Sequence, residues 1–148
     1  MKREIQWNFK GPCPGAIHDM RIRSATYDNT QTVLHCTNGL FVPGETVPAD
    51  YRIRISVPMS DMLIILTKKI RWFPFRTRRY LSGYVSPPDL LHMLKRQSLE
   101  IYDIYRNDSA SSYLIQGEFL NAKHYTGYSA TIQFSVSEED RLTLIFED

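Results

Sequence analysis

The adjacent residues His18 and Asp19 are the first stretch of the sequence whose side chains could do chemistry. An imidazole and a carboxylate both bind metals and transfer protons, and a His-Asp pair supplies two ligands in metal-dependent phosphohydrolases. Those sites need further ligands and place the pair on a helix. Here the pair precedes the strand-like alternation of Arg21-Ile22-Arg23. Hydrogen bonding of one of the two side chains to the loop that follows Pro12-Cys13-Pro14-Gly15 accounts for the pair more simply.

The remaining histidines and cysteines show no spacing typical of a catalytic or metal site. His35, His92 and His124 form no HxH or HxxxH pattern, no GxSxG accompanies them, and the seven glycines form no phosphate-binding loop. Cys36 follows His35 directly, but neighbours on a strand point to opposite faces. Without an export signal, Cys13 and Cys36 are expected to be free thiols. We therefore predict that the protein is not an enzyme and uses no cofactor and no metal.

Residues 68–80, KKIRWFPFRTRRY, are the most distinctive stretch, with six cations and four aromatic residues. Cations neutralise phosphates and rings stack on bases, so the segment could be the surface of a nucleic-acid-binding module. Arg and Trp are also preferred anchors of protein–protein interfaces. The structural alternative places the rings in the core and the cations on the solvated face of a twisted or edge strand, where they discourage aggregation.

Charge is distributed unevenly along the chain, although its net charge is only +2. Residues 1–80 carry 13 basic and 6 acidic side chains, a net +7, and residues 81–148 carry 5 and 10, a net −5. Such asymmetry steers charged partners. Exposed acids also bind basic partners, so the acidic turn 138–140 is an alternative contact. The predicted partner-binding residues are Arg71, Trp72, Arg76, Arg78 and Arg79 on the basic side, and Glu138, Glu139 and Asp140 on the acidic side.

Most of the elements that must position these side chains are predicted to be strands. Apolar and polar residues alternate in Tyr51–Val57, and the same period-two pattern recurs in residues 131–136 and 141–146. The polar residues 137–140 between the last two strands fit a hairpin connection, so we expect this pair to be antiparallel. The other predicted strands are Ile17–Tyr27, Thr32–Cys36, Leu99–Tyr105 and Ser112–Leu120.

One helix is predicted, over residues 87–97. Ser86 is placed to cap it, Pro87 suits its first position, and Asp89 completes a capping box. Short connections and the lack of a helix–strand rhythm favour an antiparallel sheet. The predicted fold class is therefore α+β, mainly antiparallel β, as a sheet or sandwich with one principal helix. A chain of 148 residues fits a single domain, 1–148.

The sequence also indicates where the protein acts. Its most apolar segment, residues 62–66, has five residues, whereas a membrane-spanning helix needs about 20. The basic N-terminus is not followed by the apolar run of a secretory signal. We therefore expect a cytoplasmic protein with no membrane span.

A resemblance to a class of bacterial proteins is carried by Ile17-His18-Asp19-Met20-Arg21-Ile22, continuing to Tyr27-Asp28 and Thr32-Val33-Leu34. This apolar-His-Asp-x-x-Ile segment resembles the start of small β-rich bacterial proteins, several of which are immunity proteins of polymorphic or contact-dependent toxin systems. The later segments 117–119, 132–134 and 142–146 are similar in style. The resemblance implies a bacterial, cytosolic, non-catalytic protein that binds and occludes a cognate toxin domain.

Three functions follow from these observations. The leading hypothesis is an immunity protein that inhibits a toxin through a protein–protein interaction. The alternative is a nucleic-acid-binding module that uses residues 68–80. The third is a metal-dependent hydrolase that uses His18 and Asp19. Many inhibitors of nucleases are acidic, whereas this chain is slightly basic, so a toxin partner either is not a nuclease or faces the acidic C-terminal half.

Overall fold

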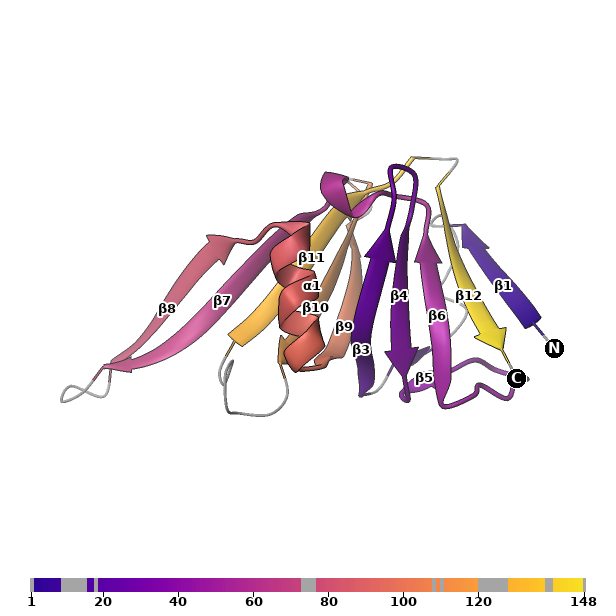
Figure 1. Ribbon diagram of the computed structural model, residues 1–148, viewed down its shortest axis with the longest axis horizontal. Helices are drawn as coiled ribbons and strands as arrows, with labels where there is room; N and C mark the ends of the chain where they lie inside the picture. Colours follow the sequence, from indigo (N-terminus) through magenta and orange to yellow (C-terminus); the bar gives the residue numbers. More distant parts are fainter. Residues whose placement is uncertain are drawn as a thin grey trace.

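The structure is a computed structural model that describes residues 2–8, 16–17, 19–72, 77–107, 109, 111–119, 128–137 and 140–147, with backbone alone for residues 7, 8, 69–72, 77–81, 107 and 147. These residues form twelve strands, one 3-10 helix and one α-helix (Figure 1). The strands are β1 (Lys2–Asn8), β2 (Ala16–Ile17), β3 (Met20–Tyr27), β4 (Thr32–Thr37), β5 (Leu40–Phe41), β6 (Asp50–Ile55), β7 (Leu63–Trp72), β8 (Thr77–Tyr84), β9 (Leu99–Asn107), β10 (Ser112–Phe119), β11 (Tyr128–Ser135) and β12 (Arg141–Glu147). The helices are η1 (Met59–Asp61) and α1 (Pro87–Arg96).

Ten of the strands form one continuous sheet in the order β1-β12-β6-β4-β3-β9-β10-β11-β7-β8. All pairings between neighbouring strands of this sheet are antiparallel. The short strands β2 and β5 pair separately. The prediction of a mainly antiparallel α+β fold with one principal helix is therefore confirmed.

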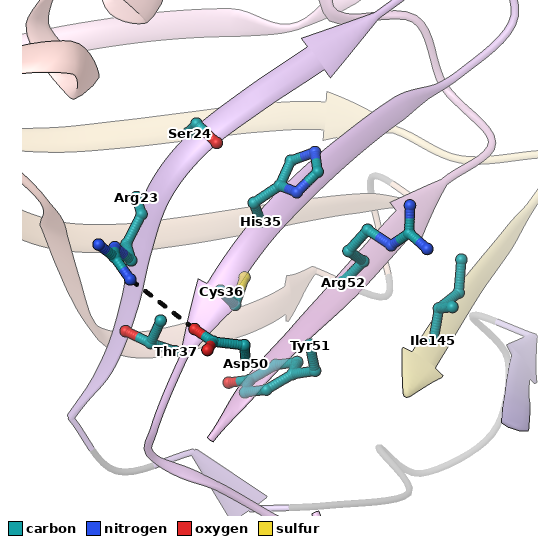
Figure 2. Close-up of a pocket in the computed structure, with 9 residues that line it drawn as sticks. All are labelled: Arg23, Ser24, His35, Cys36, Thr37, Asp50, Tyr51, Arg52 and Ile145. Carbon is teal, nitrogen blue, oxygen red and sulfur yellow. Dashed lines mark ion pairs between the residues drawn. The ribbon is translucent and has the colours of Figure 1, made fainter. Parts of the chain in front are cut away.

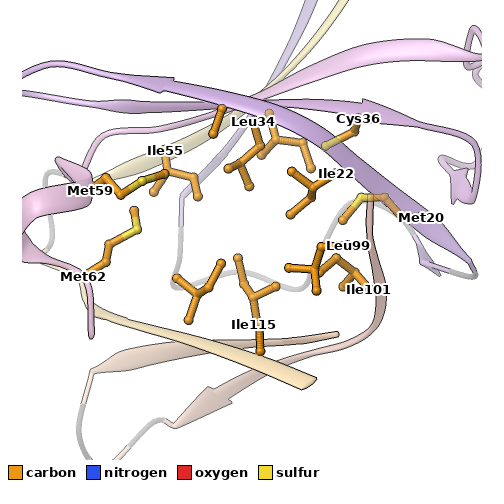
Figure 3. Close-up of a cluster of buried hydrophobic side chains, with 14 of the residues drawn as sticks. Met20, Ile22, Leu34, Cys36, Ile55, Met59, Met62, Leu99, Ile101 and Ile115 are labelled. Atoms are coloured by element: carbon orange, nitrogen blue, oxygen red, sulfur yellow. The ribbon is translucent and has the colours of Figure 1, made fainter. Parts of the chain in front are cut away.

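The sheet bends where β3 meets β9, so that its two halves face each other across the core (Figure 3). This junction has three residue pairs, Met20–Ile101, Arg21–Glu100 and Ile22–Leu99, whereas the β9–β10 pairing has eight. Alternate residues of both halves point into one cluster that includes Leu34 and Ile115. Burial of this apolar surface is the main term that stabilises the fold.

Ser86 caps helix α1 and is hydrogen-bonded to Asp89, the residue pair that the sequence predicts. The Ser86 hydroxyl accepts a hydrogen bond from the Asp89 backbone N–H at 3.3 Å and donates to the Asp89 carboxylate at 2.7 Å. The helix packs against β3 and adds three side chains to the core, namely Leu90, Met93 and Leu94. No helix among the described residues is both long and apolar enough to cross a membrane.

The expected strands are present, but one expected pairing is wrong. The segments 131–136 and 141–146 lie in β11 and β12, which do not pair with each other: β11 lies between β10 and β7, and β12 lies between β1 and β6. The connection crosses from one half of the bent sheet to the other. It is held at both ends, because the Val136 N–H donates to the Ser111 carbonyl and the Ser56 N–H donates to the Arg141 carbonyl.

The hairpins β3–β4 and β9–β10 match the predicted strand pairs. Strand β3 begins at Met20 and not at Ile17, because Asp19 has a φ of 59°, a left-handed conformation that interrupts an extended strand. In the β3–β4 turn the Asp28 carboxylate accepts hydrogen bonds from the Thr30 N–H at 2.7 Å and the Gln31 N–H at 3.0 Å. These bonds, with one from the Thr30 hydroxyl, lower the pKa of Asp28.

Candidate functional site

A strip of apolar side chains crosses the solvent-facing side of the second half of the sheet. The register places Tyr84 beside Ile65. In the neighbouring row of cross-strand partners, Leu63 lies beside Gln133, which lies beside Leu114. Leu114 in turn lies beside Tyr105. Cross-strand partners share a face, and the residues between them, such as Ile64, Ile115 and Ile132, are in the core on the other face. We call Leu63, Ile65, Tyr84, Tyr105 and Leu114 the apolar strip.

Three members of the apolar strip are exposed, and Ile65 and Leu114 are half-buried. Tyr84 is 78% exposed, Tyr105 is 49% exposed and Leu63 is 41% exposed. With a strand spacing of about 4.8 Å, the strip spans roughly 19 Å from β8 to β9. The Tyr105 hydroxyl is hydrogen-bonded to Asp103, which raises the pKa of Tyr105. Tyrosine is enriched at protein interfaces because its ring buries well while its hydroxyl stays hydrogen-bonded.

One feature of the sequence indicates the apolar strip, although it is not an alternating pattern. The run Met62-Leu63-Ile64-Ile65-Leu66 lacks the alternation seen in β6, so a strand built from it must carry apolar residues on both faces. Ile64 is 1% exposed in the core, whereas Leu63 and Ile65 lie on the outer face. Tyr84 and Tyr105 join them through pairings that no local pattern reveals.

The predicted basic contact lies on a hairpin that continues from the apolar strip. Arg71 and Trp72 end β7, Arg78 and Arg79 begin β8, and the register pairs Arg71 with Arg78. Arg76 and the aromatic residues Phe73 and Phe75 lie outside the described residues. The two strands extend away from the rest of the sheet in Figure 1. Neither strand contains an acidic residue, and neither does β11 beside them.

Two described interactions extend the surface onto this hairpin. The Lys68 ammonium lies 5.0 Å from the centroid of the Tyr128 ring, within cation–π range. The hydroxyls of Thr67 and Ser82 are hydrogen-bonded across β7 and β8 at 3.0 Å. The hairpin is thus fixed to the sheet by a regular register and by side-chain contacts near its base.

The predicted acidic contact is not brought near the basic one. Asp140 closes the turn before β12, where its carboxylate accepts a hydrogen bond from the Ser137 N–H. Strand β12, which follows Asp140, lies well away from the β7–β8 hairpin in Figure 1. Glu138 and Glu139 lie outside the described residues. The described geometry therefore gives Asp140 a structural role and does not join the two predicted groups in one surface.

A shallow depression of about 690 Å³ lies over β3, β4 and β6 (Figure 2). His35 and Arg52 are cross-strand partners within it. Burial lowers the pKa of His35, and the charge of Arg52 lowers it further. Arg23 lies 3.8 Å from Asp50 at one edge. Charged and polar side chains therefore line part of the depression, and the neutral form of the His35 imidazole is favoured.

The cysteine that lines this depression is deeply buried, and the arginines beside the depression are paired with acids. Cys36 is 2% exposed and burial raises the pKa of its thiol, so the reactive thiolate is disfavoured. It is a free cysteine on the face opposite to His35, as the alternation predicts. The flanking cations are matched by acids, since Arg21 lies 3.3 Å from Glu100 and Arg23 is paired with Asp50. Surface pairs of this kind contribute little stability.

The hydrolase hypothesis depended on His18 and Asp19. His18 lies outside the described residues, and Asp19 is exposed before β3. Within the described part of the chain, no three His, Cys, Asp or Glu side chains gather to hold a metal ion.

Comparison of the chain with models of protein families, with curated proteins and with solved structures found no match.

Proposed function

We propose that this chain is a non-catalytic binding protein that recognises another protein through the apolar strip and the adjoining β7–β8 hairpin. The observation that carries the proposal is the exposure of Tyr84, Tyr105 and Leu63 on one face of a rigid sheet. Binding by occlusion needs no catalytic group. It needs aromatic anchors that become buried on contact, surrounded by charges that select the partner.

The partner class that we propose is a bacterial toxin domain, so that the protein acts as an immunity protein. Support comes from the resemblance of residues 17–34 to immunity proteins of polymorphic toxin systems. The hairpin adds a physical criterion, because its cations favour an acidic surface on the toxin. An occluding inhibitor of this kind works from the cytoplasm of the bacterium that produces the toxin.

The experiment measures binding of the toxin domain encoded beside this chain's gene. Tyr84→Ala and Tyr105→Ala are each expected to raise the Kd about thirtyfold, as for anchors worth about 2 kcal/mol. Phe41→Ala is the matched control, because Phe41 is 63% exposed on β5 outside the strip. Isothermal titration calorimetry reports all three. Equal Kd values for the wild type and both tyrosine variants would contradict the proposal.

A nucleic-acid-binding module is the second candidate function, favoured by the lack of any acidic residue in β7, β8 and β11. It predicts that a labelled single-stranded oligonucleotide binds the protein with an affinity that falls steeply with added salt. Arg71→Gln with Arg78→Gln would then reduce the salt dependence. Binding that ignores salt, or no binding to any oligonucleotide, would eliminate this candidate.

A further inference from the structure

Among the described strands, β8 is the last at one end of the sheet. Figure 1 shows it on the outer side of β7, projecting from the rest of the sheet. An end strand presents backbone N–H and C=O groups that can pair with an added strand. The C-terminal end of β8 is open, because Ser82, Gly83 and Tyr84 are exposed and a Cβ built on Gly83 meets no atom within 4 Å.

The hydrogen-bond pattern identifies which backbone groups face outward. The Val85 N–H donates to the Ile64 carbonyl at 2.9 Å, and the register pairs Tyr84 with Ile65. In an antiparallel pair, hydrogen-bonded and non-hydrogen-bonded residue pairs alternate. On β8 the odd-numbered residues therefore bond to β7. The backbone groups of the even-numbered residues point to the open edge, namely those of Arg78, Tyr80, Ser82 and Tyr84.

Strand β8 lacks several of the features that keep an edge strand from pairing with another chain. Residues 77–84 contain no proline. Their register with β7 runs without a bulge from Trp72–Thr77 to Ile65–Tyr84. Cations are the remaining device, and they act selectively, because they repel a basic strand and attract an acidic one.

The charge of the β7–β8 hairpin determines which kind of strand would fit beside β8. Residues 68–80 carry six cations and no acid, so two copies joined along β8 would bring twelve cations together. The strand at the other end, β1, is different, because its Lys2 and Arg3 lie 2.7 Å from Glu4 and Glu45. An acidic extended segment is therefore favoured over a second copy of this chain.

We propose that the open edge of β8 accepts an extended acidic segment of the partner protein as an eleventh strand, hydrogen-bonded to the backbone of Arg78, Tyr80, Ser82 and Tyr84. This inference rests on the proposed protein-binding function and specifies its mode. Main-chain hydrogen bonds give such strand addition its affinity, and the charges beside the edge give it selectivity.

The test compares two substitutions at Ser82. Ser82→Pro removes an outward N–H without removing a backbone bond to β7, and Ser82→Ala removes the same hydroxyl, with its bond to Thr67, but keeps the N–H. The probe is a labelled, capped decapeptide of alternating glutamate and valine, measured by fluorescence anisotropy at low salt. We expect Ser82→Ala to bind like the wild type and Ser82→Pro to bind at least tenfold more weakly. Equal binding by both variants, or no binding to the wild type, would overturn the inference.

A second measurement works without a variant. In hydrogen exchange followed by NMR, the outward amides of Arg78, Tyr80 and Ser82 should exchange rapidly in the free protein and at least tenfold more slowly with saturating peptide. The inward amides of Arg79 and Leu81 are protected in both states. A peptide N-methylated at every residue keeps its charge, has no N–H to donate from either edge, and should give no protection. Protection by the methylated peptide would show attraction by charge alone and would overturn strand addition.

The outcomes separate this inference from the proposed function. If Ser82→Pro binds the toxin domain as tightly as the wild type while Tyr84→Ala and Tyr105→Ala do not, the partner contacts the face of the sheet and strand addition is wrong. If Ser82→Pro weakens the complex and the two tyrosine variants do not, the edge is the contact and the apolar strip is not.

Discussion

The position of His35 on β4 favours the neutral form of its imidazole. Burial lowers its pKa, and Arg52, its partner on β6, adds a like charge that lowers it further. On β3 its cross-strand partner is the uncharged Ser24. The pKa of His35 is therefore lower in the folded chain than in the unfolded chain, where it is about 6.5. Protonation is harder in the folded state, so folding stability falls as the pH drops through 6.5 toward the folded pKa.

We predict that His35→Gln flattens this pH dependence. In the wild type the urea midpoint should decrease between about pH 7.5 and about pH 5, because the unfolded chain takes up the proton first. The variant has no imidazole at this position and should lose part of that decrease. His92→Gln, on the exposed side of α1, is the matched control and should keep it. An unchanged slope in His35→Gln would contradict the assignment.

Gly117 is required where β9 and β10 change register. A Cβ at this position would lie 2.5 Å from the Glu100 carbonyl oxygen and 2.9 Å from the Ile101 side chain. Gly117→Ala should therefore destabilise the protein by about 2 kcal/mol, because backbone atoms must shift. Gly83→Ala meets nothing within 4 Å and should change stability by less than about 0.5 kcal/mol. Urea unfolding measures both, and equal midpoints would show that the β9–β10 register adjusts freely.

Among the elements, helix α1 depends for its stability on the hydrogen bonds of its first turn. Ser86→Ala removes both hydrogen bonds to Asp89 and should cost about 1 kcal/mol of folding stability. Ser24→Ala, an exposed serine on β3, is the control and should cost less than about 0.5 kcal/mol. Thermal unfolding followed by circular dichroism reports the difference. A Ser86 variant as stable as the control would mean that packing alone fixes the start of the helix.

The elements were predictable where the signal is local. Alternation located β6 and β4, and the Ser-Pro-Pro-Asp sequence located the start of α1 to the residue. Pairing across the bend was not predictable, because the five residues between β11 and β12 suit a hairpin as well as a crossing. The members of the apolar strip were not predictable for a similar reason. Its members Leu63, Tyr84 and Tyr105 are about 20 residues apart and meet only through long-range register.

At the scale of the whole molecule, both halves of the bent sheet share one core. Ile101 is fully buried at the β3–β9 junction. Ile101→Ala should therefore lower the free energy of unfolding by about 2–5 kcal/mol in a single cooperative transition. Tyr105→Ala, on the same strand but exposed, should cost less than about 0.5 kcal/mol. Two separate unfolding transitions in the Ile101 variant would indicate that the halves are stabilised independently.

The charge map of the whole molecule could not be read from the order of charges along the chain. Residues 1–80 are basic and residues 81–148 are acidic, yet folding brings Arg21 of the first part beside Glu100 of the second. Within the first part, Arg54 of β6 is paired with Glu4 of β1 at 3.4 Å. The cations of residues 68–80 lie instead on a hairpin at one end of the sheet, beside a strand without acids.

The chain begins and ends on neighbouring strands, because Lys2 of β1 pairs with Glu147 of β12. Both strands lie at the opposite end of the sheet from β8 in Figure 1. A fluorescent reporter, an affinity handle or a biosensor surface attached at this end is therefore separated from β8 by most of the width of the molecule. Immobilised in this way, the protein would present its basic hairpin to solution without obstruction.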